Sequence, residues 1–178
     1  MLLIQDLAMQ AGYLLPALLP ALLVTAAWQM WSGRQRPFPE RLQGIWKQKW
    51  LLLFWVYLFA MLISALISRP ETDPSQNVFS HMWFGRDEKW NNEIIENILF
   101  FIPHTLLFLL AFRPAKPLRA ALLLSLATTV LIEAGQLVFW RGAFQVSDIL
   151  YNMLGGFLGW GLFRLAGLCA RPADQTEN

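Results

Sequence analysis

The residues best able to do chemistry lie in the last third of the chain, in the stretch IEAGQLVFWRGAFQVSDILYNMLGGFLGWGLF, residues 132–163. Two carboxylates and two carboxamides interrupt its apolar sequence: Glu133, Asp148, Gln136 and Asn152. Polar side chains at membrane depth are costly and are seldom placed there without partners or a task. Carboxylates can transfer protons and carboxamides can hydrogen-bond a ligand, so we expect the function to reside here.

Helical spacing groups these residues into faces. Glu133 and Gln136 are three residues apart, and the same stripe continues through Thr129 and Ser125. Asp148 and Asn152 are four residues apart, and Gly155 and Gly159 extend their face. A third apolar segment carries Asn97 and His104, seven residues apart. The economical arrangement brings the three stripes together and away from lipid.

Structural alternatives stand beside the functional ones. Asp148, which follows Ser147, could compensate a helix dipole, whereas Glu133 lies deeper and is expected to have no capping role. Glu133, Asp148 and Arg141 could form a salt-bridge network that holds an outer loop. In the functional alternative they line a polar pocket in which Arg141 acts as a clamp for a phosphate or carboxylate group.

Two further features have equally plain alternatives. The Gly155-x-x-x-Gly159 spacing permits close helix packing, or it could leave a groove for a lipid chain. His104 follows Pro103 in mid-helix, where a lone histidine more often packs and hydrogen-bonds than acts as a ligand or proton relay.

Composition places these residues in a membrane protein. The chain has 178 residues, of which 56% are hydrophobic and only 15% are charged. Five segments are long and apolar enough to cross a bilayer, which requires roughly 20 residues each. They are Leu7–Trp31, Trp50–Ile67, Ile94–Phe112, Leu118–Val138 and Asp148–Leu168. No cleavable signal peptide is evident, so the first segment is expected to remain as an anchor.

The basic residues predict an orientation. Ten of the 14 lysines and arginines fall in the loops after the first and third segments or at the C-terminal end. The positive-inside rule therefore puts the N-terminus outside and the C-terminus inside, which agrees with five spans. Asn97, Glu133, Gln136, Asp148 and Asn152 then converge near the outer leaflet, with Arg141 in a short outer loop. The loop Pro70–Trp90 lies on the same side.

Several classes of site are not indicated. The single Cys169 excludes an internal disulfide and a cysteine-based zinc site, and no zincin, P-loop or nucleophile-elbow motif is present. The net charge of +2 is not clustered as in nucleic-acid-binding proteins. We therefore predict no cofactor, no metal and no nucleic-acid partner. A hard-cation site would be the alternative, built from Glu133, Asp148, Asn97 and His104.

Two blocks of the chain resemble the VanZ-like family of bacterial membrane proteins. The first is ENILFFIPHTLLF, residues 96–108, and the second is IEAGQLVFWRGAFQVSDILYNMLGGFLG, residues 132–159. The family's pattern falls on Asn97, Pro103, Glu133, Gln136, Arg141, Asp148, Asn152, Gly155 and Gly159. His104 departs from it, since the family usually has a small or aliphatic residue there. The family is named for a protein associated with low-level teicoplanin resistance, so the resemblance implies a role at the cell envelope.

We therefore expect an all-α, five-helix membrane bundle over residues 1–170, with the motif region at about 90–168 and a disordered cytoplasmic tail at 171–178. The expected location is the bacterial cytoplasmic membrane. The leading hypothesis is a pocket that binds, moves or shields a lipid or lipid-linked glycan. Its contacts would be Asn97, Gln136, Arg141, Asn152, Gly155 and Gly159, together with the carboxylates.

Two alternatives remain open. The protein could be an intramembrane enzyme, with Glu133 as general acid or base and Asp148 orienting it or activating water. It could instead be a non-catalytic assembly factor that docks another membrane protein, or a second copy of itself, through its glycine face.

Overall fold

The computed structural model describes residues 8, 11–32, 48–67, 71, 88–141 and 145–169. Its elements are five α-helices: α2 (Leu14–Ser32), α4 (Lys49–Leu66), α5 (Glu88–Phe112), α6 (Pro117–Phe139) and α7 (Val146–Cys169). The prediction of an all-α bundle is therefore confirmed for the described residues. The segment Pro70–Trp90 lies largely outside them, as does the tail 171–178.

Four of these helices are long and apolar enough to cross a membrane: α2, α4, α6 and the part of α5 from Asn91 to Phe112. The chain is thus a membrane protein with several apolar helices. The 24-residue α7 has the length of a span. However, its polar residues and glycines lower its mean hydropathy, and it is not among the four. Five spans and the orientation of the termini accordingly stay predictions.

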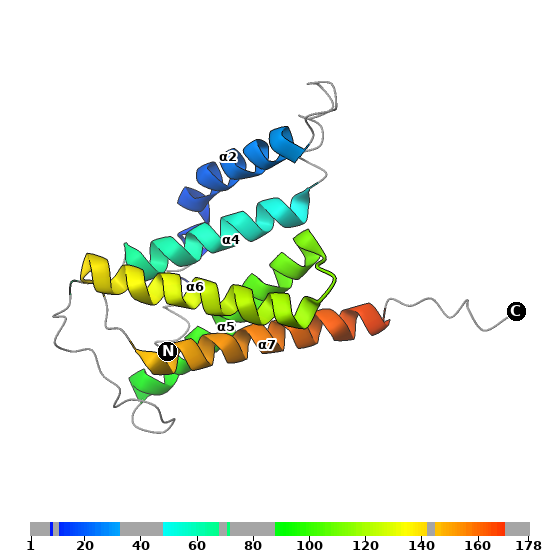
Figure 1. Cartoon of the computed structure of the whole chain (residues 1–178). Coiled ribbons are helices and arrows are strands. Elements are labelled where there is room, and N and C mark those ends of the chain that lie inside the picture. Colours follow the sequence, from blue (N-terminus) through cyan, green and yellow to red (C-terminus); the bar gives the residue numbers. More distant parts are fainter. Residues whose placement is uncertain are drawn as a thin grey trace, which may run out of the picture.

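The helices run in alternating directions, as Figure 1 shows from their colours. The C-terminal ends of α4 and α6 and the N-terminal ends of α5 and α7 therefore lie at one end of the bundle. This arrangement brings together segments that are far apart in sequence. The polar residues predicted to converge can do so only if these helix ends lie together.

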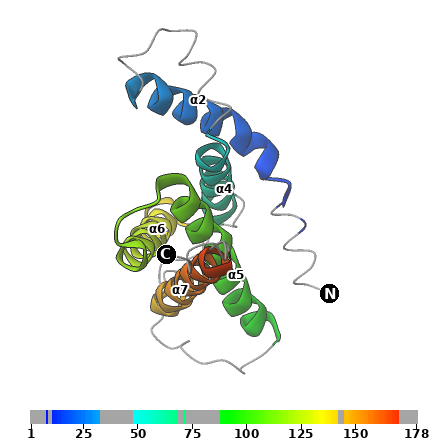
Figure 2. The same ribbon diagram turned by 90° about the vertical axis from the view of Figure 1, so that its right-hand side faces the viewer.

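Packing divides the molecule into a bundle and an added helix. The closest association is between α5 and α7, and α6 packs on α7 while also contacting α4 and α5. Viewed along the helices in Figure 2, α2 lies outside α4, away from this group. It packs mainly on α4, and the side chains of Gln29 and Gln48 hydrogen-bond across that contact.

The core beneath the polar end is apolar and joins three helices. Met61 of α4, Phe101 of α5 and Ile132 of α6 form a buried cluster. The Tyr57 hydroxyl donates a hydrogen bond to the Phe100 carbonyl oxygen at 3.1 Å, which ties α4 to α5. These contacts hold α4, α5 and α6 together next to the polar residues of α6.

Candidate functional site

Helix α6 turns one polar face into the bundle. Its opposite face is apolar and exposed, as expected for a helix in contact with lipid, and includes Val130, Leu131 and Val138. The buried polar face confirms the stripe predicted from the spacing. It consists of Ser125, Thr128, Thr129, Glu133 and Gln136.

The polar face of α7 meets that of α6. Asn152 is buried, and its Nδ2 donates a hydrogen bond to Thr129 Oγ1 at 2.8 Å. Asp148 lies one turn earlier, in the first turn of the helix, and is 9% exposed. The two helices thus share polar contacts that would be strongly disfavoured if either helix turned this face to lipid.

A partly open pocket lies where these faces meet α4 and α5. Its empty volume is about 490 Å³, including the open mouth. Five of the eight residues predicted for the site line it: Asn97, Glu133, Gln136, Asp148 and Asn152. The remaining wall is made by Met61, Ser64, Ala65, Glu96, Phe100, Phe101 and Ile132. We call this the polar pocket.

Glu133 is tied to the start of α7. Its side chain is 1% exposed, and Oε2 accepts a hydrogen bond from the backbone N–H of Gln145 at 2.9 Å. Gln145 immediately precedes α7, so the carboxylate lies at the positive end of that helix. The expectation that Glu133 has no capping role was therefore wrong. The partner comes from a helix that follows it in sequence, which spacing within α6 cannot indicate.

Two carboxamides in the pocket keep a buried acceptor atom without a partner in the described structure. Gln136 donates from Nε2 to the Ala65 carbonyl oxygen at 3.3 Å, while its Oε1 is buried and unbonded. Because a carbonyl oxygen can only accept, this bond fixes which end of the Gln136 amide is the acceptor. Asn152 Oδ1 is likewise buried and unbonded.

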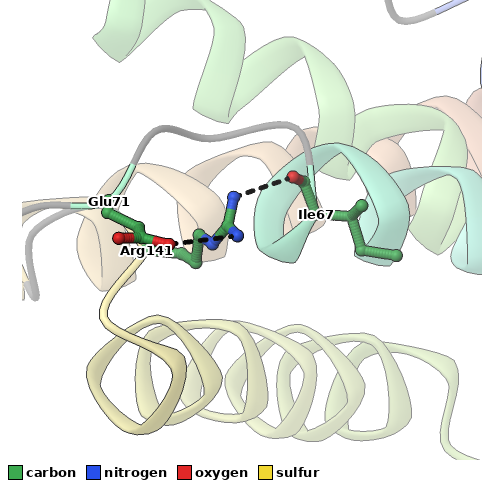
Figure 3. A network of polar contacts seen from close by, with 3 residues as sticks. All are labelled: Ile67, Glu71 and Arg141. Carbon is green, nitrogen blue, oxygen red and sulfur yellow. Dashed lines mark hydrogen bonds and ion pairs between the residues drawn. The ribbon is translucent and has the colours of Figure 1, made fainter.

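Arg141 points elsewhere. Its guanidinium donates to the Ile67 carbonyl oxygen at 3.3 Å and pairs with Glu71, with 3.6 Å between Nη2 and Oε1 (Figure 3). Its backbone N–H bonds the Gln136 carbonyl oxygen at 2.9 Å, after Trp140 has ended α6 in a left-handed conformation. The structure therefore does not bring the Arg141 side chain into the polar pocket with the other predicted residues.

The Arg141 side chain instead lines a second hollow, which is largely apolar. It has an empty volume of about 850 Å³, including open space, and we call it the apolar hollow. Its other lining residues are Phe59, Leu62, Ile63, Leu66, Ile67 and Phe139. These α4 residues lie on a different helical face from Met61, Ser64 and Ala65, so the two hollows lie on different sides of α4.

The glycine face of α7 is occupied by α5. A Cβ added at Gly155 would lie 2.2 Å from the Ile98 carbonyl oxygen, and one at Gly159 would lie 2.5 Å from that of Ile102. The two backbones approach so closely that neither glycine is open to a lipid chain or another protein. This contact is the helix-packing alternative given for the GxxxG spacing.

His104 also has a packing environment. It is fully buried between the rings of Phe54 and Phe101, with centroids 5.7 and 5.3 Å away, and its Nε2 lies 3.4 Å from Thr128 Oγ1. It does not line the polar pocket. Among the described residues, no three histidines, cysteines or carboxylates are grouped so as to hold a metal ion.

Sequence reasoning missed two polar lining residues, Glu96 and Ser64. Glu96 is the first residue of the block at residues 96–108 and directly precedes Asn97, but it was not assigned to the site. Its place beside that residue at the start of an apolar helix was the available signal. Ser64 offered none, because a single serine in an apolar helix is common.

Comparison with known proteins agrees with the geometry. The VanZ/LLP1 family model matches residues 50–167, a range that holds the polar pocket and omits α2. A protein of Enterococcus faecium named Protein VanZ is 37% identical over 86 residues, which cover 48% of this chain and 50% of that protein. The chain thus spans about half the length of this relative. No solved structure matches. Since the family match covers about two thirds of the chain and includes every lining residue of the pocket, the chain belongs to the VanZ/LLP1 family.

Proposed function

We propose that the protein binds the polar head of an envelope amphiphile, a lipid or lipid-linked glycan, in the polar pocket. The observation that carries this proposal is the buried, unpartnered Oε1 of Gln136 on the pocket wall. Leaving such an atom without a hydrogen bond costs about 1–3 kcal/mol. A ligand or ordered water that donates to it would recover that free energy.

The surroundings of Gln136 suit a head group. Asn97, Asn152 and Ser64 can both donate and accept hydrogen bonds, and Glu133 and Asp148 add carboxyl groups. Phe100, Phe101 and Met61 supply apolar wall next to these groups. Ligand sites combine a few placed polar groups with apolar walls, and the lining of the polar pocket has both.

The proposed setting is the outer leaflet of the bacterial cytoplasmic membrane, as the distribution of basic residues predicts. Binding there would allow the protein to shield or move an envelope lipid. A contribution to glycopeptide resistance, which the family resemblance implies, would follow if the bound molecule or its glycan is part of the antibiotic's target. Arg141 is proposed as an anion contact on the side of the apolar hollow.

Native mass spectrometry of the gently solubilised protein tests binding. We expect a defined lipid adduct on the wild type that is lost in Gln136→Leu, which removes the unpartnered acceptor while keeping an unbranched Cβ. Gln29→Leu is the matched control, because Gln29 is also a buried, hydrogen-bonded glutamine but lies on α2. If every adduct survives Gln136→Leu, or if no form of the protein carries an adduct, the proposal is contradicted.

An intramembrane enzyme is the second candidate, because the predicted acid–base pair, Glu133 and Asp148, lines one pocket. Glu133 would then exchange a proton with the bound lipid while Asp148 orients it or activates water. Glu133→Gln distinguishes the candidates, since it would stop turnover and spare binding in the enzyme. Docking of another protein through the glycine face gains no support, because α5 fills that face.

A further inference from the structure

The polar pocket is rich in groups that accept hydrogen bonds. Three of its lining residues are carboxylates, Glu96, Glu133 and Asp148. Among the described residues that line it there is no lysine or arginine, and the Arg141 side chain lines the apolar hollow instead. The described lining thus offers acidic groups and amide oxygens but no cationic side chain.

The two buried carboxamides strengthen this bias. Gln136 uses one amide N–H on the Ala65 carbonyl oxygen, and Asn152 uses one of its own on Thr129 Oγ1. Both residues are at least nine-tenths buried, at 1% and 4% exposure. The atoms of these two amides that make no hydrogen bond at all are acceptors, Gln136 Oε1 and Asn152 Oδ1. A ligand that satisfies both must therefore bring N–H or O–H groups.

The carboxylates of the pocket favour some N–H or O–H donors over others, according to the charge of the head group that carries them. A phosphate or carboxylate would enter a site of low dielectric lined by carboxylates, where like charges repel strongly. A protonated primary amine presents three N–H donors and a positive charge, and loses little when carboxylates and amide oxygens replace its water. A quaternary ammonium has the same charge but no N–H group.

We propose that the head group enters the polar pocket as a protonated primary amine. This inference rests on the proposed function, because it names the chemical class that the same pocket selects. An aminophospholipid and an amino-sugar group of a lipid-linked glycan both carry such an amine. In either case Gln136 Oε1 and Asn152 Oδ1 accept from the ammonium, and Glu133 balances its charge.

A competition between matched lipids tests the inference on the full-length wild-type protein. Equimolar palmitoyl-oleoyl phosphatidylethanolamine, phosphatidylcholine and phosphatidylglycerol are offered in detergent, and bound lipid is read by native mass spectrometry. We expect the ethanolamine lipid to be retained about tenfold over the choline lipid, as expected from one charge-assisted hydrogen-bonded contact. Gln136→Leu should abolish the preference, and Gln29→Leu should leave it intact.

A second arm separates the two sources of the amine. Glucosamine and N-acetylglucosamine are compared as soluble competitors, because acetylation removes the ammonium and leaves the sugar. Displacement of lipid by glucosamine alone, without preference for the ethanolamine lipid, would assign the amine to a glycan.

The outcomes are distinguishable. If neither amine probe exceeds its matched control while retention still depends on Gln136, the amine inference is overturned and the lipid pocket stands. A preference for the glycerol lipid that is lost in Gln136→Leu would overturn it in the same way. If no retained lipid depends on Gln136, the proposed function itself fails. The lipid comparison is made on the wild-type protein, so its result does not depend on whether a variant folds.

Discussion

The polar pocket and the apolar hollow lie on different sides of α4, and they differ in chemistry. The polar pocket gathers carboxylates and amide oxygens from α5, α6 and α7, and those from α6 and α7 are buried. The apolar hollow has aliphatic and aromatic walls and a single charged lining residue, Arg141. One face of α4 completes each of them. The polar residues that sequence analysis grouped into one site are therefore divided between a polar hollow and an apolar one.

The cause of this separation is the end of α6. Gln136 and Arg141 are five residues apart, but Trp140 adopts a φ of 54° and ends the helix between them. The chain then turns so that the Arg141 backbone caps the Gln136 carbonyl, while its side chain reaches the end of α4 at Ile67. If α6 had continued, the directions of the Gln136 and Arg141 side chains would both have followed from the helical period.

The largest effect is expected where the polar pocket is built, at the contact of α5 with α7. Gly155→Ala places a Cβ 2.2 Å from the Ile98 carbonyl oxygen, and backbone cannot move away as a flexible side chain can. Overpacking of this kind costs about 1–3 kcal/mol. We expect a clearly lower unfolding temperature in detergent and a loss of lipid retention in the polar pocket.

Gly161→Ala is the control for that change, because nothing lies within 4 Å of the added Cβ and the residue is on the same helix. It should leave the unfolding temperature and lipid retention close to those of the wild type. Equal behaviour of the two variants would mean that the α5–α7 contact does not hold the pocket together.

An intermediate effect is expected at Glu133, where structure and charge can be separated. Glu133→Ala removes the acceptor of the Gln145 N–H and should lower the free energy of unfolding by about 1–3 kcal/mol. Glu133→Gln keeps an oxygen that can accept the same bond, so it should lose less stability. Chemical unfolding in mixed micelles measures both. Equal losses would show that the carboxylate charge, rather than the bond to the start of α7, is what stabilises this end of the pocket.

Much of the helical framework could be predicted from the sequence. The predicted segments Trp50–Ile67 and Leu118–Val138 differ from α4 and α6 by one residue at each end. Apolar length and the breakers that bound it suffice for such boundaries. The inward polar face of α6 was also predictable, because Ser125, Thr129, Glu133 and Gln136 follow a helical period.

The remaining features depend on tertiary contacts that carry no periodic signal. Helix α4 is apolar all round, so its sequence does not show which face closes the polar pocket. Arg141 follows the end of α6, and residues in short connections have no period from which to infer a direction. The bond from Gln145 to Glu133 joins two segments through backbone geometry alone.

The smallest effect on stability is expected at Arg141, and it tests the comparison most directly. The Arg141 and Glu71 side chains are 35% and 81% exposed, so their ion pair should contribute no more than about 1 kcal/mol. Arg141→Ala should therefore unfold almost like the wild type and keep Gln136-dependent lipid retention. It should lose only the anionic lipid held on the side of the apolar hollow, and the difference should shrink as salt is raised. Glu71→Gln, which removes the opposing charge, should have the reverse effect on that anionic lipid.

If Arg141→Ala instead abolished Gln136-dependent retention, the two hollows would have to be read as one site. A ligand spanning them would then need to reach around α4.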